Sequence, residues 1–157
     1  MLKKSIITVL LIAPLFGVEI VINKSSEPIE ISTFTRDNIK EVVTDSATGL
    51  MWQDDASVKS IIGSWSGAKE YCKNLTQSGY SDWFLPSIVE LESIVDIKRY
   101  NPAIKKEFQN SVSSYYWSSS PSVPSSDYAW LVYFKSGYSY RSNKTGNLYV
   151  RCARAGQ

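Results

Sequence analysis

The chain of 157 residues contains no histidine. This absence excludes the Ser-His-Asp and Cys-His arrangements that activate a nucleophile in many hydrolases. The sequence also lacks a P-loop and a G-x-G-x-x-G loop, two common phosphate-binding motifs. A lysine or carboxylate base is chemically feasible, but the carboxylate pairs Asp54/Asp55 and Glu90/Glu92 do not face each other on regular structure. We therefore expect no enzyme and no cofactor.

Cysteine is scarce, with two residues in the whole chain. Two thiolates without histidine fall short of a usual zinc set, so we expect no metal site. Calcium at Asp54, Asp55 or Asp127 is the alternative. No D-x-D-x-D-G loop is present, and we expect Asp54 and Asp55 to lie at a solvated strand end.

Long hydrophobic runs are also missing, except for residues 6–15 near the N-terminus. That run is too short for a comfortable membrane span. With Lys3, Lys4 and Gly17 around it, residues 1–17 read as a signal peptide, and an uncleaved anchor is the alternative. We expect residues 18–40 to be a linker or a peripheral strand and residues 41–157 to form one domain. The mature protein is expected to have no stable membrane span and to be exported to the periplasm, cell surface or exterior.

Export gives the two cysteines a role, because thiols in an oxidising compartment most simply form a disulfide, Cys72–Cys152. Apolar spacing predicts a helix over residues 67–77 with Ser66 as its N-cap, and Cys72 lies on the apolar face. Alternation predicts a final strand over residues 148–154, with Cys152 on its inward face. A helix packed on a sheet would bring the two sulfurs together.

Residues 79–91 contain the strongest local indications of secondary structure in the sequence. Ser87 and Glu90 form an S-x-x-E capping box at a helix start, directly after Pro86. The residues before it alternate as in an extended segment. Asp82 is a candidate ligand, but we expect it instead to bond turn amides beside Gly79.

The remaining apolar segments read as strands. A hairpin is expected at 41–44 and 50–52, and further strands at 115–120, 129–135 and 138–141. The tryptophans expected in the core are Trp52, Trp83, Trp117 and Trp130, and Trp65 is expected to be exposed.

Net charge gives no support for polyanion binding, and we expect no nucleic-acid partner. The chain has 17 basic and 15 acidic residues, and residues 1–17 hold two of the lysines, so the mature chain has 15 of each sign. Charge distribution is more informative, because no acid follows Asp127. Five cations do: Lys135, Arg141, Lys144, Arg151 and Arg154.

Tyrosines alternate with these cations along the sequence. Their rings can stack on a ligand, and the cations can bind sulfate or carboxylate groups. We therefore predict a ligand-binding face, for an anionic polysaccharide or a cell-surface protein. Its candidate residues are Tyr128, Lys135, Tyr138, Tyr140, Arg141 and Lys144. The alternative is that these aromatics are ordinary sheet surface and the cations are merely solvated.

The motifs together resemble the bacterial DUF1566 family, also described through the C-terminal domain of the Legionella collagen-like adhesin. The matching pieces include T-G-L-M-W-Q at 48–53, G-Y-S-D-W at 79–83, L-P-S at 85–87, Y-W-S-S-S at 116–120 and V-R-C at 150–152. The family pattern usually has arginine where this chain has Phe84.

This resemblance implies an α+β, C-type-lectin-like fold, with two helices packed on twisted antiparallel strands and the terminal segments paired. It also implies an exported adhesion module that binds sulfated glycosaminoglycans, although the collagen-like stalk of that adhesin is absent here. The alternatives are a structural or assembly module that binds another surface protein, and a degenerate relative of the formylglycine-generating enzymes.

Overall fold

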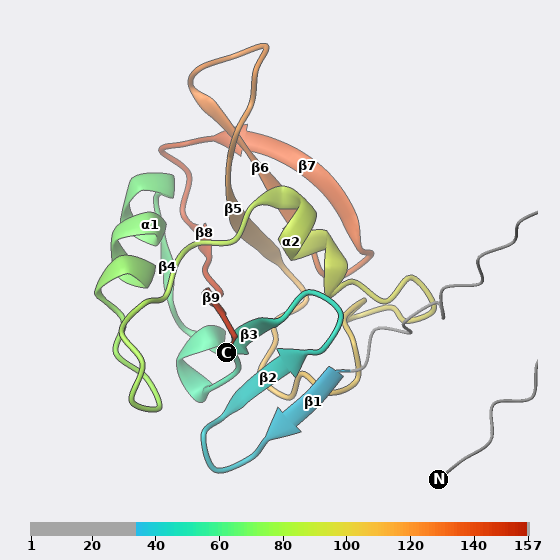
Figure 1. Cartoon of the computed structure of the whole chain (residues 1–157). Helices are drawn as coiled ribbons and strands as arrows, with labels where there is room; N and C mark the ends of the chain where they lie inside the picture. Colours follow the sequence, from blue (N-terminus) through green and yellow to red (C-terminus); the bar gives the residue numbers. More distant parts are fainter. Residues whose placement is uncertain (1–33, 157) are drawn as a thin grey trace, which may run out of the picture.

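The computed structural model describes residues 34–156 and shows a mixed α+β chain of two sheets and two α-helices (Figure 1). The expected α+β class is therefore confirmed. The expected signal peptide at 1–17, and residues 18–33 of the expected linker, lie outside the described residues.

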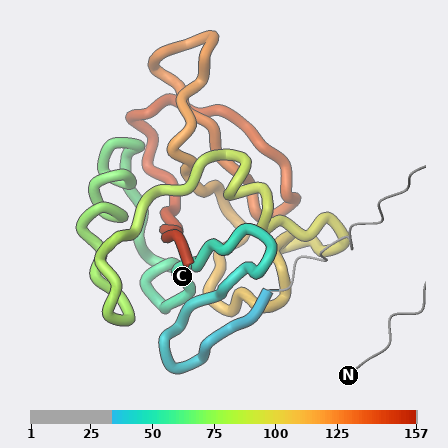
Figure 2. Tube along the Cα trace, in the orientation of Figure 1, coloured from blue at the N-terminus to red at the C-terminus, as the bar shows by residue number. Residues whose placement is uncertain are grey.

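A four-stranded antiparallel sheet has the order β1-β2-β3-β9. Its strands are β1 (Phe34–Asp37), β2 (Val42–Asp45), β3 (Leu50–Gln53) and β9 (Ala153–Ala155). β1 is the described part of the 18–40 segment that folds as a strand, and it lies at the sheet edge. β9 pairs with β3, so the C-terminal residues run beside the start of the domain (Figure 2). The expected pairing of the terminal segments is thus present.

A second sheet has five strands in the order β4-β8-β5-β6-β7. They are β4 (Ile62–Gly63), β8 (Leu148–Tyr149), β5 (Tyr115–Pro121), β6 (Tyr128–Tyr133) and β7 (Tyr138–Asn143). Neighbours pair antiparallel except β5 and β8, which are parallel. β7 is an edge strand, and it continues two residues beyond the strand expected at 138–141.

The expected final strand over residues 148–154 is wrong as a single element. The chain leaves the five-stranded sheet after Tyr149, crosses the core and enters the four-stranded sheet at Ala153. Arg151 and Cys152 lie in the crossing and are fully buried. Simple alternation could not reveal the break, because both sides of the crossing segment are surrounded by protein.

Helix α1 spans Trp65–Asn74, two residues earlier at its start than expected. Ser64, not Ser66, is the N-cap, because its hydroxyl accepts a hydrogen bond from the Gly67 N–H. The helix ends three residues before the expected end, since Leu75 adopts an extended conformation. A short 3-10 helix at Ala56–Lys59 precedes it.

Helix α2 spans Ile88–Ser93 and begins with the expected capping box. The Ser87 hydroxyl accepts from the Glu90 N–H, and the Glu90 carboxylate accepts from the Ser87 N–H. Just before it, Trp83 and Leu85 are buried, Asp82 and Phe84 are more exposed, and Phe84 forms an antiparallel bridge to Ala153. The extended approach to the helix is therefore confirmed.

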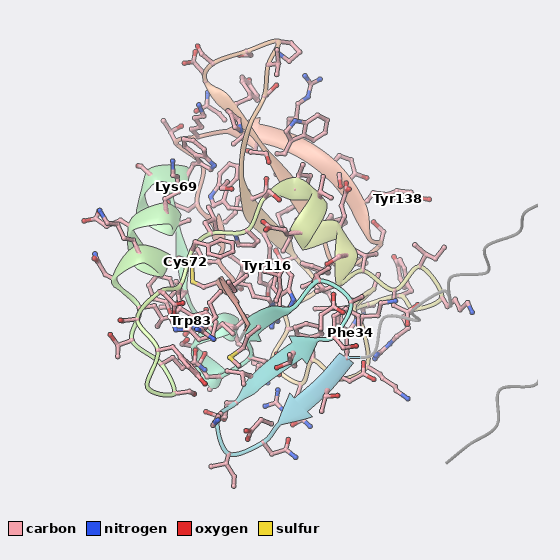
Figure 3. All side chains as sticks on the ribbon, in the orientation of Figure 1. Phe34, Lys69, Cys72, Trp83, Tyr116 and Tyr138 are labelled. Carbon is pink, nitrogen blue, oxygen red and sulfur yellow. A yellow bond between two sulfur atoms is a disulfide. The ribbon has the colours of Figure 1, made fainter. Side chains whose placement is uncertain are left out.

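The expected disulfide joins Cys72 of α1 to Cys152 of the crossing segment, with the two Cα atoms 5.5 Å apart. Both cysteines are fully buried in an apolar cluster that also contains Trp83 and Trp117 (Figure 3). A second apolar cluster surrounds Trp52. Trp65 and Trp130 are only partly buried, so the expectation for Trp130 as a core residue is wrong.

Candidate functional site

The β6–β7 hairpin divides the predicted ligand-binding residues between its two faces. Side chains opposite each other in an antiparallel pair share a face, and neighbours along a strand alternate. Tyr140 lies opposite Leu131, and Arg141 lies opposite Trp130. Arg141 therefore shares one face with Trp130, and its guanidinium carbon is 5.5 Å from the Trp130 ring centroid. Tyr140 lies on the other face.

The same register places Tyr138 on the face of Tyr140, and Tyr128 on the face of Arg141. The two predicted lysines lie beyond opposite ends of β7. Lys135 is in the β6–β7 turn, with its ammonium 6.0 Å from the Tyr100 ring centroid. Lys144 follows β7 at the other end. The six residues therefore do not form one continuous site.

Two of the five C-terminal cations are buried in ion pairs. Arg151 Nη1 lies 2.9 Å from Asp54 Oδ1, and both side chains are fully buried. Burial lowers the pKa of Arg151 to about 10, which leaves it charged at neutral pH. Arg154 is also buried and donates two hydrogen bonds to Asp82, at 2.7 and 3.0 Å. Neither arginine is available to an external ligand.

The expectation that Asp54 lies at a solvated strand end is wrong. Its carboxylate pairs with Arg36 and Arg151 and accepts hydrogen bonds from the backbone N–H groups of Gln109 and Asn110. These partners occupy both carboxylate oxygens. Asp54 therefore serves to join β1, the crossing segment and the loop near residue 110.

Asp82 also has a different role from the one expected. Instead of bonding turn amides beside Gly79, its carboxylate holds Arg154 of β9. The hydrogen bonds from Arg154 lower the pKa of Asp82, and the same contact raises the pKa of Arg154. The Arg154 guanidinium lies 3.8 Å from the Tyr80 ring centroid. This contact fastens the 79–85 segment to the C-terminal strand.

A lysine cluster forms instead around Trp65, at the first turn of α1. The Lys69 and Lys144 ammonium groups lie 4.5 and 4.4 Å from the Trp65 ring centroid. Lys144 also donates to the Ser126 carbonyl at 2.5 Å, which fixes its position. The Trp65 indole N–H donates to the Ser118 carbonyl at 2.8 Å, so the ring itself is anchored to β5.

Lys73 lies one helical turn beyond Lys69, and residues four apart on a helix are neighbours on its surface. Lys69 and Lys73 line a groove of about 720 Å³ between α1 and the segment before α2. Figure 3 shows Lys69 on α1 with Trp83 below it, and both residues line this groove. Its lining residues are Lys69, Glu70, Lys73, Asn74, Trp83, Phe84, Leu85 and Ser119.

Positive charge dominates this region. The only ion pairs within residues 34–156 join arginines to Asp54 and Asp82, so Lys69, Lys73 and Lys144 have no carboxylate partner there. In the described part of the chain, Glu70 is the one acid that lines the groove. The ammonium groups of Lys69 and Lys73, beside the apolar part of the groove, can bind anionic groups while the apolar part contacts an apolar surface of the ligand.

Sequence reasoning identified Lys144 but missed the rest of the lysine cluster. The available signal was the i, i+4 spacing of Lys69 and Lys73 on the polar face of a predicted helix. Within residues 34–156, no group of three His, Cys, Asp or Glu side chains lies close enough to hold a metal ion. No helix among those residues is both long and apolar enough to cross a membrane.

Comparison with known proteins relates the chain to one family. No curated protein matches it. The family model described as the Lcl C-terminal domain matches residues 41–154, well over half of the chain. This match includes both helices, the disulfide and all strands except β1 and the last residue of β9. It confirms the resemblance drawn from the sequence motifs, and the chain belongs to the Lcl C-terminal domain family.

Proposed function

We propose that this chain is an exported, non-catalytic binding module that holds an acidic or sulfated glycan at the lysine cluster. Family membership supports the broader role, an adhesion-related module. One observation carries the finer role: Lys69 and Lys144 converge on the Trp65 ring without a carboxylate partner in residues 34–156, and Lys73 continues the row along α1.

The groove beside these lysines suits the apolar part of a sugar ligand. An acidic glycan carries sulfate or carboxylate groups on rings whose C–H faces are apolar. The lysines would bind the charged groups, and the partly exposed Phe84 would pack against a ring face. Asn74 and Ser119 provide hydrogen-bonding side chains on the same lining.

A C-type-lectin-like topology is part of this proposal. Two helices, mainly antiparallel sheets and paired terminal segments support it. The topology alone does not imply sugar binding, so the proposal depends on the lysine cluster. Both cysteines are joined to each other, which is why we propose a binding role instead of one derived from the cysteine chemistry of formylglycine-generating enzymes.

A protein partner is the second candidate function, favoured by a separate apolar patch. Ile97 and Tyr138 line a hollow beside the start of β7 and are 87% and 68% exposed. Such a contact would depend on apolar area and would survive high salt, whereas binding at the lysine cluster would weaken as salt rises.

The experiment that tests the proposal is salt elution of the oxidised protein from immobilised heparin. The test variant carries Lys69→Gln, Lys73→Gln and Lys144→Gln. The matched control carries Lys59→Gln, Lys98→Gln and Lys106→Gln, three exposed lysines outside the groove. Both variants have the same net charge, so any difference between them reports position.

We expect the test variant to bind heparin about tenfold more weakly than the control, which corresponds to about 1.4 kcal/mol. Equal elution of the two variants would refute the lysine cluster as the site. If the test and control variants elute equally and a Lys135→Gln, Arg141→Gln variant binds heparin more weakly, the site lies on the β6–β7 hairpin predicted from the sequence.

A further inference from the structure

One face of the five-stranded sheet carries three tyrosines whose rings pack together, Tyr115, Tyr133 and Tyr140. The Tyr115 and Tyr133 rings are stacked, with centroids 4.2 Å apart and an angle of 17° between their planes. The Tyr140 ring meets both edge-on, at 6.2 and 6.3 Å. Three strands contribute one ring each, so the group is held rigidly by mutual packing.

These tyrosines remain open to solvent. Tyr115 is 39% exposed and Tyr140 is 46% exposed. They border a hollow of about 290 Å³ with the buried Leu131 at its base, and Ser142 and Leu148 complete the lining together with Arg141. Leu148 belongs to β8, so the hollow spans the sheet from β7 to β8.

Among residues 34–156, Arg141 is the one charged residue that lines the hollow. No carboxylate lines it among residues 34–156. Arg141 contributes to its rim, but the Arg141 guanidinium stacks over Trp130 on the opposite face of the hairpin and contacts the Ser122 hydroxyl. A cationic ligand would therefore find no counter-charge in the hollow, and an anionic ligand would have to draw the Arg141 guanidinium away from Trp130 and Ser122.

We propose that this hollow binds a single neutral pyranose ring as a subsite separate from the lysine cluster. Aromatic rings can cover the apolar C–H face of a sugar, and the Ser142 and tyrosine hydroxyls can exchange hydrogen bonds with sugar hydroxyls. A volume near 290 Å³ lies at the lower end of the range for ligand pockets, which fits one ring better than a chain.

The two subsites use different residues and different chemistry. The lysine cluster is built on α1 and the turn after β7, whereas the tyrosine hollow is built on β5, β6, β7 and β8. The proposal therefore goes beyond the acidic-glycan function and does not depend on it.

The test is saturation-transfer NMR on the oxidised protein with six neutral probes at millimolar concentration. They are the methyl α- and β-pyranosides of glucose, galactose and mannose. The test variants are Tyr115→Ala and Tyr140→Ala. Tyr128→Ala is the matched control, because Tyr128 is 41% exposed but lies on the other face of the hairpin.

We expect at least one probe to receive saturation from the wild type, with its dissociation constant raised fivefold or more by Tyr140→Ala and unchanged by Tyr128→Ala. High salt and the triple lysine variant should leave this binding unchanged. Absence of saturation transfer to all six probes would overturn the proposal. An equal loss of pyranoside binding in Tyr128→Ala would also overturn it. So would a protein that binds no pyranoside but forms a dimer that Tyr140→Ala dissociates.

Discussion

Arg151 and Asp54 form an ion pair that is wholly closed to solvent, with Nη1 and Oδ1 2.9 Å apart. Arg151 also donates to the backbone carbonyls of Gln53 and Asn110, and to the Ser111 hydroxyl. One side chain thus connects the end of β3, the loop near residue 110 and the C-terminal crossing segment. The pair is structural, and it explains why a basic residue so near the C-terminus contributes nothing to ligand binding.

Removing one partner of this pair should destabilise the protein strongly. Asp54→Asn leaves the buried Arg151 and the neighbouring Arg36 without their carboxylate, and breaking such a buried pair typically costs about 3–5 kcal/mol. Urea unfolding followed by tryptophan fluorescence measures the loss. Asp127→Asn makes the same chemical change on an exposed side chain, and we expect it to change the free energy of unfolding by less than about 0.5 kcal/mol. Similar costs for both variants would contradict this account of Asp54.

The Cys72–Cys152 disulfide should contribute comparable stability, because it links residues 80 positions apart. A Cys72→Ser, Cys152→Ser variant is expected to lose about 2–5 kcal/mol relative to the oxidised protein. Chemical reduction of the wild type should shift the urea midpoint in the same direction. A midpoint that is unchanged by both treatments would show that the bond does not stabilise the domain.

The Asp82–Arg154 contact predicts a pH dependence of stability. An aspartate whose pKa is lowered by folding adds stability above its unfolded pKa of about 3.9, and this contribution is lost as pH falls through the folded pKa. The difference in unfolding free energy between wild type and Asp82→Asn should therefore be constant above about pH 5. It should shrink below about pH 4. Urea titrations from pH 3 to 7 measure this difference, and one that grows on acidification would refute the assignment.

Glu70 should oppose anion binding, because it is the acid that lines the lysine groove. Glu70→Gln is expected to raise heparin affinity about two- to threefold, or roughly 0.5 kcal/mol for one exposed charge. Glu41→Gln makes the same charge change at an exposed position in the β1–β2 turn and is expected to have a smaller effect. Isothermal titration with a heparin hexasaccharide compares the two variants. Equal gains in affinity would mean that only net charge matters.

Local signals in the sequence predicted a large part of the fold. The capping box at Ser87, the hairpin formed by β2 and β3, and the disulfide were all expected and are all present. Each depends on short-range patterning or on a covalent bond with one available partner. The start of α1 was misplaced because Ser64 and Ser66 are both good N-cap residues, and only the structure shows which hydroxyl meets the helix.

The candidate site was harder to predict, because it depends on long-range pairing. The sequence cannot show that Arg151 meets Asp54, which is 97 residues away, or that Arg154 meets Asp82. Both arginines therefore counted as free cations. The register of β6 and β7 then separates Arg141 from Tyr140, although they are adjacent in sequence. Lys69 and Lys144 meet at Trp65 only after the β7–β8 turn packs against α1.

The most direct test of the central claim is to map the bound glycan by amide chemical shifts. A ¹⁵N-labelled sample of the oxidised protein would be titrated with a heparin tetrasaccharide at low salt. We predict that the largest shifts fall on residues 65–74, 83–85 and 144, around the lysine cluster. Shifts confined to the β6–β7 turn and Arg141, or no saturable shifts at all, would contradict the claim.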